Sequence, residues 1–182
     1  MKTLLAVLGS TRPGSTSHQV ANQVIAGAKS AGYQVVEYHI NELDFKGGLG
    51  CGACRKMDRD CIQKDGLTPI LSALHQADAL LVSAPNYYAH VSGQMIAFLN
   101  RLYCMTRADR TNRLPAGKKL VTVFSQGAPE GYPKYQAHYE WYNQCLTSKG
   151  LELAGSLNVG GDSDLSPDSS LMQQAYRLGA EL

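Results

Sequence analysis

The sequence predicts an α/β protein in which a parallel, doubly wound sheet carries helices on both of its faces. Short apolar runs alternate with stretches in which apolar residues recur at helical spacing, as in successive βα units. Crossovers of this kind place the strands parallel. The length of 182 residues suits one domain, and no repeat or low-complexity linker divides the chain. We therefore expect residues 1–182 to form a single domain.

The expected strands are apolar or β-branched runs that end at turn-forming or polar residues. They are Thr3–Leu8, Gln34–His39, Ala79–Ser83, Lys119–Phe124 and Leu151–Val159. The expected helices follow these runs and are Ser17–Ala31, Leu67–Gln76, Ser92–Met105, Tyr135–Ser148 and Ser169–Ala180. One segment, Asn41–Gly66, fits neither pattern. It is long for a connection between a strand and a helix, which indicates a functional insertion.

Composition excludes several classes of function. An apolar fraction of 44% and a charged fraction of 18% are typical of a soluble globular protein. The formal net charge of +2 is too small to indicate binding to nucleic acid or to a membrane surface. The apolar run after Met1-Lys2 is too short for a signal peptide, and no run reaches the length of a membrane span. We expect a cytoplasmic protein, and the odd number of cysteines, five, argues against a disulfide framework.

The loop after the first strand has the composition of a phosphate site. It reads Gly9-Ser10-Thr11-Arg12-Pro13-Gly14-Ser15-Thr16-Ser17 and leads into the first helix. Backbone N–H groups and the helix dipole converge at such a helix start, and hydroxyls and Arg12 would complete an anion cradle. The alternative is an ordinary turn with Thr16 or Ser17 as the helix cap. We favour phosphate, because a cap alone needs neither five hydroxyls nor an arginine.

Two further loops follow the third and fourth strands. Ligands in such sheets bind at the carboxyl ends of strands, near the switch in strand order. The third-strand loop contains Pro85-Asn86-Tyr87-Tyr88, and the fourth-strand loop begins Ser125-Gln126-Gly127. A planar ligand could lie between these loops, or the tyrosines could instead pack on neighbouring helices. Beside a phosphate site, such a polar, aromatic-lined cleft matches flavin mononucleotide (FMN).

These motifs resemble the flavodoxin-like NAD(P)H-dependent FMN reductase family. Its hallmarks are a Gly-Ser-x-Arg loop, a Pro-x-Tyr loop and a Ser-Gly-led helix that ends in Asp-Arg. Here they read Gly9-Ser10-Thr11-Arg12, Pro85-Asn86-Tyr87, Ser92-Gly93 and Asn100-Arg101, with asparagine in place of the aspartate. The resemblance implies a flavodoxin-like three-layer sandwich with a five-stranded parallel sheet.

The resemblance also implies a cofactor site and an activity. FMN would be bound at its phosphate by Ser10, Arg12, Ser15, Thr16 and Ser17, flanked at its ring by Pro85, Asn86, Tyr87 and Tyr88, and closed in by Ser125, Gln126 and Gly127. The enzyme would pass a hydride from NAD(P)H through FMN to a quinone, a flavin or a similar acceptor, without an acid or base residue. The rival is an electron-carrier or redox-sensing flavoprotein whose physiological donor is not a nicotinamide.

Members of the family form homodimers or homotetramers, so a homo-oligomer is expected. The apolar residues of the fourth helical segment suit either such an interface or the core; they are Met95, Ile96, Phe98, Leu99 and Leu102. We expect no nucleic-acid partner and no membrane.

The insertion carries three cysteines, Cys51, Cys54 and Cys61. It resembles the segment of the iron–sulfur flavoproteins that reads Cys-x2-Cys-x2-Cys-x(4–7)-Cys, but Gly48 stands at the first ligand position. Three interpretations stay open: a cluster with an outside ligand, a zinc site completed by His75 or Asp65, and free thiols without a metal. We favour free thiols. The other two cysteines, Cys104 and Cys145, lie in helical patterns and are expected in the core.

Overall fold

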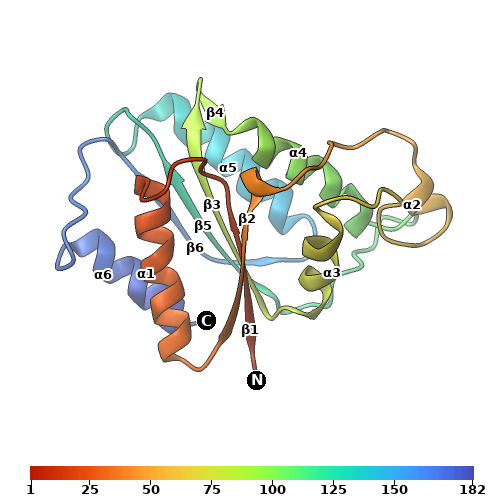
Figure 1. Ribbon diagram of the computed structural model, residues 1–182, viewed down its shortest axis with the longest axis horizontal. Helices are drawn as coiled ribbons and strands as arrows, with labels where there is room; N and C mark the ends of the chain where they lie inside the picture. Colours follow the sequence, from red (N-terminus) through yellow and green to blue (C-terminus); the bar gives the residue numbers. More distant parts are fainter.

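The computed structural model describes residues 1–182 and has three layers, with a central sheet between two layers of helices (Figure 1). The parallel strands are β1 (Thr3–Leu8), β2 (Gln34–His39), β3 (Ala79–Tyr87), β5 (Lys119–Ser125) and β6 (Glu152–Val159). Their order is β2-β1-β3-β5-β6, and the short β4 (His90–Val91) pairs antiparallel with β3. The predicted flavodoxin-like fold with five parallel strands is confirmed. The change in strand order lies between β1 and β3, where such sheets bind ligands.

Helices cover both faces of the sheet (Figure 1). On one face lie α1 (Thr16–Ser30) and α6 (Ser170–Ala180); on the other lie α3 (Thr68–Gln76), α4 (Gly93–Arg101) and α5 (Pro133–Thr147). Short elements complete the chain: α2 (Ala53–Lys56) and the 3-10 helices η1 (Ile40–Glu42) and η2 (Leu102–Met105). All ten expected elements form, with boundaries that differ by one or two residues except in β3 and α4.

Alternation along the strands builds a separate core on each face. In β1, Leu5 and Val7 pack on the α3–α5 side, and Leu4, Ala6 and Leu8 pack on the α1–α6 side. This alternation follows from the two-residue period of a strand. Burial on both faces requires an apolar run without interruption, as the sequence of β1 shows.

The strand β3 runs to Tyr87, four residues beyond its expected end at Ser83, and turns back through Tyr88 and Ala89 into β4. Both turn residues have positive φ, +56° and +72°, as a two-residue hairpin turn requires. Neither residue is glycine, so the turn carries no signal in the sequence. The expectation of a simple loop after the third strand was therefore wrong.

The helix expected over residues 92–105 is an α-helix only to Arg101 and continues as η2. Its apolar residues lie in the core: Met95, Phe98 and Leu102 are fully buried, Leu99 is nearly so, and Ile96 packs against them. This face of α4 therefore does not offer an interface to a second copy.

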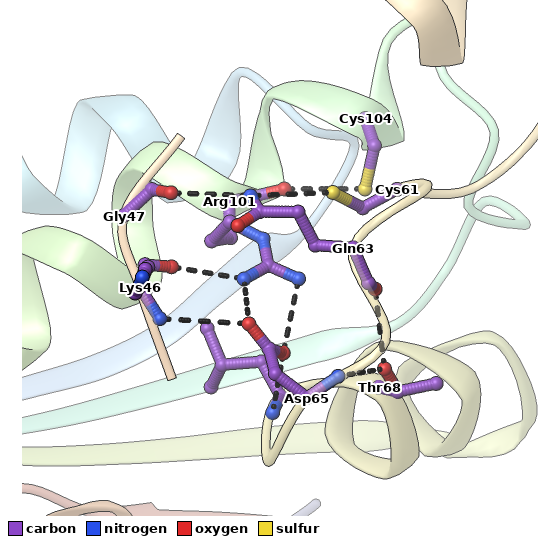
Figure 2. Close-up of polar contacts among 9 residues, drawn as sticks. Lys46, Gly47, Cys61, Gln63, Asp65, Thr68, Arg101 and Cys104 are labelled. Atoms are coloured by element: carbon purple, nitrogen blue, oxygen red, sulfur yellow. Dashed lines mark hydrogen bonds and ion pairs between the residues drawn. The ribbon is translucent and has the colours of Figure 1, made fainter. Parts of the chain in front are cut away.

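A buried ion pair joins the insertion 41–66 to α4 (Figure 2). The Arg101 side chain is fully buried, and its Nη1 and Nη2 donate to Asp65 at 2.5 and 3.1 Å. Nη1 also donates to the carbonyl oxygen of Lys46 at 2.9 Å. Burial opposes ionisation of Asp65, but its hydrogen bonds to Arg101 and to the Leu67 N–H outweigh this and hold its pKa below the ordinary value. The pair fixes both ends of the insertion on the α4 side of the sheet.

Candidate FMN site and cysteine cavity

The predicted phosphate loop joins β1 to α1 at the carboxyl end of the sheet. Its first residue, Gly9, is held from three sides. Its N–H donates to the Ser83 carbonyl at 2.8 Å, and its carbonyl accepts from Asn41 Nδ2 at 2.9 Å and from Ser92 Oγ at 3.4 Å. A Cβ at position 9 would lie 2.8 Å from the Ser83 carbonyl oxygen, so only glycine lets β1 and β3 approach in this way. The loop is thereby fixed beside the end of β3.

The start of α1 leaves backbone donors free. The helix cap is Ser15, whose Oγ accepts from the His18 N–H at 3.4 Å, so the expected cap at Thr16 or Ser17 was wrong. The N–H groups of Thr16 and Ser17 lie in the first turn and have no acceptor in the protein. The buried Ser10 hydroxyl accepts from the Arg12 N–H at 3.2 Å and shapes the loop from within.

The charges around this helix start favour an anion. No acidic residue lies in the first turn of α1, so the positive end of the helix dipole is not neutralised by the protein. The Arg12 side chain is exposed and is engaged in no ion pair. Burial, together with the neighbouring His39, lowers the pKa of His18, which therefore stays neutral at pH 7. Of the five predicted phosphate residues, Arg12 is exposed and Ser15 and Thr16 are half-buried, whereas Ser10 and Ser17 are buried.

The two other predicted loops lie side by side at the same end of the sheet. Pro85 and Ser125 are register partners in β3 and β5, which brings both loops together. Tyr87 is partly exposed and Tyr88 fully exposed at the hairpin tip, so Tyr88 does not pack on a neighbouring helix. Gly127 is exposed on the opposite loop. Both sides of the expected ring position are therefore open to a planar ligand.

Tyr139 of α5 links these two loops, a role that the sequence analysis missed. The Asn86 Nδ2 donates to the Tyr139 hydroxyl at 3.1 Å, and this hydroxyl donates to Gln126 Oε1 at 2.9 Å. Gln126 Nε2 in turn donates to the Pro129 carbonyl at 2.6 Å. The Tyr139 ring is buried and stacks on Phe124 with 4.5 Å between ring centroids, and burial raises its pKa to about 12. It is a positioning residue that engages Asn86 Nδ2 and Gln126 Oε1, and it leaves Asn86 Oδ1 without a partner in the protein.

Tyr139→Phe is expected to lower the free energy of unfolding by about 1–3 kcal/mol, because the buried amide of Gln126 and the half-buried amide of Asn86 each lose a hydrogen-bond partner. It is also expected to weaken FMN binding, since Asn86 and Gln126 flank the expected ring position. Denaturant titration and FMN titration measure the two effects. Tyr142→Phe is the matched control, because its buried hydroxyl donates at 3.0 Å to the Met95 carbonyl in α4. An equal loss of FMN affinity in both variants would contradict the positioning role.

All five cysteines line one cavity of about 600 Å³, which shares no residue with the three FMN loops. Cys51, Cys54 and Cys61 come from the insertion, Cys104 from η2 and Cys145 from α5. Cys104 lies in the core as expected, whereas Cys145 is half-buried. Burial raises the pKa of Cys104 to about 11, so it is a neutral thiol at pH 7. The cavity brings together cysteines that are distant in the sequence.

The structure does not place a single metal ion among these thiols. No three side chains of His, Cys, Asp or Glu converge as the ligands of one ion. The two residues considered as a fourth zinc ligand have other partners: His75 Nε2 lies 2.9 Å from Asp60 Oδ1, and Asp65 is paired with Arg101. The zinc interpretation therefore finds no support in the geometry.

The fold defines a class of protein: a flavodoxin-like α/β protein whose sheet changes strand order between β1 and β3, next to the loop that leads into α1. A model of the NADPH-dependent FMN reductase family matches residues 2–139. The chain belongs to this family, as its motifs predicted.

The chain is also similar to curated iron–sulfur flavoproteins. One from Archaeoglobus fulgidus is 25% identical over 174 residues, which are 92% of this chain and 76% of the relative. A second from that organism is 32% identical over 135 residues, which are 74% of this chain and 64% of the relative. This chain therefore spans less than two thirds of that relative's length. One from Methanosarcina thermophila is 26% identical over 161 residues, 88% of this chain and 78% of the relative.

Solved structures agree with the fold. An NADH:FMN oxidoreductase in its apo form has a TM-score of 0.69 at 21% identity, with 100% of this chain and 88% of that chain covered. An azoreductase from Bacillus anthracis has a TM-score of 0.74 at 14% identity, with both chains covered fully. An NAD(P)H:quinone oxidoreductase from Methanothermobacter marburgensis has a TM-score of 0.72 at 15% identity, covering 98% and 94%. In this chain, no helix is both long and apolar enough to span a bilayer.

Proposed function

We propose that this protein is an FMN-dependent oxidoreductase that takes electrons from NADPH or NADH and delivers them to a quinone, a flavin or a similar small acceptor. The observation that carries the proposal is the start of α1, where two N–H groups have no acceptor and the exposed Arg12 precedes them, directly after the strand that pairs with β3. Membership of the FMN reductase family supports the same cofactor.

The residues of the site divide into three roles. The phosphate would be bound by the α1 start, through the hydroxyls of Ser15 and Thr16, the first-turn N–H groups and the Arg12 guanidinium. The hairpin residues Pro85–Tyr88 would lie along one side of the ring. The residues Ser125–Gly127 would lie along the other side and bring backbone groups to it.

Bound FMN would supply the hydride and electron chemistry. The protein's own residues bind and orient, and we assign no side chain as acid or base. The exposed aromatic tip at Tyr88 leaves the expected ring site open to solvent. An open site suits a donor and an acceptor that bind there in turn, in a ping-pong sequence.

The cofactor is tested first. The purified protein is expected to be yellow, or to bind added FMN with the absorption changes of a bound flavin. A protein that stays colourless in excess FMN would contradict the proposal.

The reaction is tested by oxidation of NADPH and of NADH with a quinone as acceptor. Turnover that depends on FMN and shows ping-pong kinetics is expected. If the FMN-loaded protein oxidises neither NADPH nor NADH in the presence of a quinone, the enzyme proposal would be contradicted.

The electron-carrier alternative rests on the cysteine-lined cavity, which an FMN reductase does not need. Anaerobic mixing separates the two. NADPH or NADH is expected to bleach the bound flavin as fast as steady-state turnover. If dithionite bleaches the bound flavin but neither NADPH nor NADH reduces it, the result would favour the electron carrier.

The proposal includes a homodimer or homotetramer in the cytoplasm, with no nucleic-acid or membrane partner. The exposed Tyr87 and Tyr88 at the edge of the site suit cover by a neighbouring copy. Light scattering coupled to gel filtration measures the mass of the assembly. The odd cysteine count supports a reducing compartment.

A further inference from the structure

The cysteine cavity has the donor set of an iron–sulfur site. A four-iron cluster binds four thiolates, one at each iron. The four sulfur ligands therefore lie farther apart than the ligands of a single metal ion, and they are spread over the wall of a cavity. The insertion supplies three thiols, and Gly48 occupies the position where the related motif has its first cysteine. The cavity supplies two further thiols from other elements.

We propose that Cys104 takes the place of the missing cysteine and that Cys51, Cys54, Cys61 and Cys104 together bind a four-iron, four-sulfide cluster in this cavity. This site is separate from the FMN site and does not depend on the proposed reductase activity.

The position of Cys104 favours it over Cys145. The side chains of Cys104 and Cys61 point toward one another (Figure 2), and Cys54 lines the same cavity. The Cys104 Sγ donates at 3.1 Å to the carbonyl of Arg101, which places the thiol at the buried end of the cavity. Cys145 lies on α5, half-buried, beside Lys149.

Gly48 and Cys104 approach the same part of α4 and η2. A Cβ at Gly48 would lie 3.5 Å from the carbonyl oxygen of Asn100, one helical turn before Cys104, and 3.8 Å from the Asn100 Cβ. Both positions line the cavity. A thiol at either position can therefore face the same volume.

The charges of the wall also match. Arg101 and Lys149 line the cavity, and no aspartate or glutamate does. The cluster assembles from two ferrous ions, two ferric ions and four sulfides, and the four cysteine thiols that bind it release four protons. No electron is transferred in this step. The cluster with its four thiolates carries a net charge of −2. Asp65 balances the charge of Arg101, so Lys149 and the absence of a lining carboxylate are what favour such an anion. When bound, the cluster would supply one-electron transfer.

The test uses the full chain, purified without oxygen with its FMN retained. It is reconstituted with equal amounts of ferrous and ferric iron and with sulfide. Iron, acid-labile sulfide and FMN per chain are measured, and the dithionite-reduced protein is examined by electron paramagnetic resonance. The wild-type chain is expected to hold about four irons and four sulfides with the resonance of a reduced cluster.

Three variants identify the fourth ligand. C104S is expected to lose at least three quarters of the iron and the resonance while it retains FMN. C145S, the matched control on the same cavity, is expected to retain both. The double variant G48C/C104S is expected to recover the iron, because position 48 has room for a side chain and no strained φ. This recovery distinguishes a lost ligand from a damaged fold.

Several outcomes would overturn the proposal. A wild-type chain that binds FMN and holds no iron after reconstitution means that the thiols are free. If C104S holds the same amount of iron as the wild-type chain, or if C145S loses iron instead, Cys104 is not the fourth cluster ligand. Since FMN is measured in each sample, failure of the cluster proposal is distinguished from failure of the flavin proposal.

Discussion

Asp65→Ala is expected to lower the free energy of unfolding by about 3–5 kcal/mol, the cost of leaving one partner of a buried ion pair alone. The variant leaves the Arg101 guanidinium fully buried, with only the Lys46 carbonyl as a partner. It also removes the acceptor of the Leu67 N–H, which donates to Asp65 Oδ1 at 3.1 Å before α3. Denaturant-induced unfolding measures the loss.

Glu152→Ala is the matched control for an exposed ion pair. Its carboxylate is 55% exposed and lies 2.7 Å from Lys119 Nζ, which is exposed as well, so its removal is expected to cost less than about 1 kcal/mol. Asp65→Ala with Arg101→Met removes both charges and is expected to cost less than the sum of the single variants. Equal losses in Asp65→Ala and Glu152→Ala would contradict the weight given to the buried pair.

The same pair makes stability depend on acid. The folded-state pKa of Asp65 is lower than its ordinary value of 3.8. Its contribution is therefore fully present above this value and is lost as the pH falls through the folded-state pKa. Unfolding measured from pH 6 down to pH 2 is expected to show a shallower decline in Asp65→Asn than in the wild-type chain.

Arg12→Ala is expected to weaken FMN binding by about 10- to 100-fold, because a charged hydrogen bond to the phosphate contributes about 1.5–3 kcal/mol. The Arg12 side chain has no partner within the protein, so its loss leaves the fold unchanged. The affinity is measured by quenching of flavin fluorescence.

Riboflavin is the sharpest control, because it has the same ring and no phosphate. Its affinity is expected to be the same in Arg12→Ala and in the wild-type chain. Lys29→Ala removes an equal charge from the last turn of α1 and is expected to change neither affinity. If Arg12→Ala weakened the binding of riboflavin as much as the binding of FMN, Arg12 would not act at the phosphate.

The strand, turn and helix start around Gly9 could be predicted because their signals are local. An apolar run, a stop at Gly9 and a group of hydroxyls before a helical period define a strand, a turn and a helix start within a few residues. The hairpin after β3 could not be predicted in the same way. Tyr88 and Ala89 adopt positive φ because β4 pairs with the end of β3, and that pairing is not a property of either residue alone.

Tyr139 shows the same limit within the site. Its helical spacing predicted α5, and its hydroxyl has a role only because Asn86 at the end of β3 and Gln126 just after β5 both reach it. The register of Pro85 with Ser125 sets this meeting point. No window along the sequence contains all three side chains.

By itself, the sequence determined the five parallel strands, the helices between them and the turn between β1 and α1, because periodicity and turn composition act over neighbouring residues. Only the tertiary structure decided that Arg101 pairs with Asp65 and that Cys104 and Cys145 share a cavity with the cysteines of the insertion. Packing of α4 and α5 against the insertion creates these contacts, and packing depends on the whole set of side chains that fill the core.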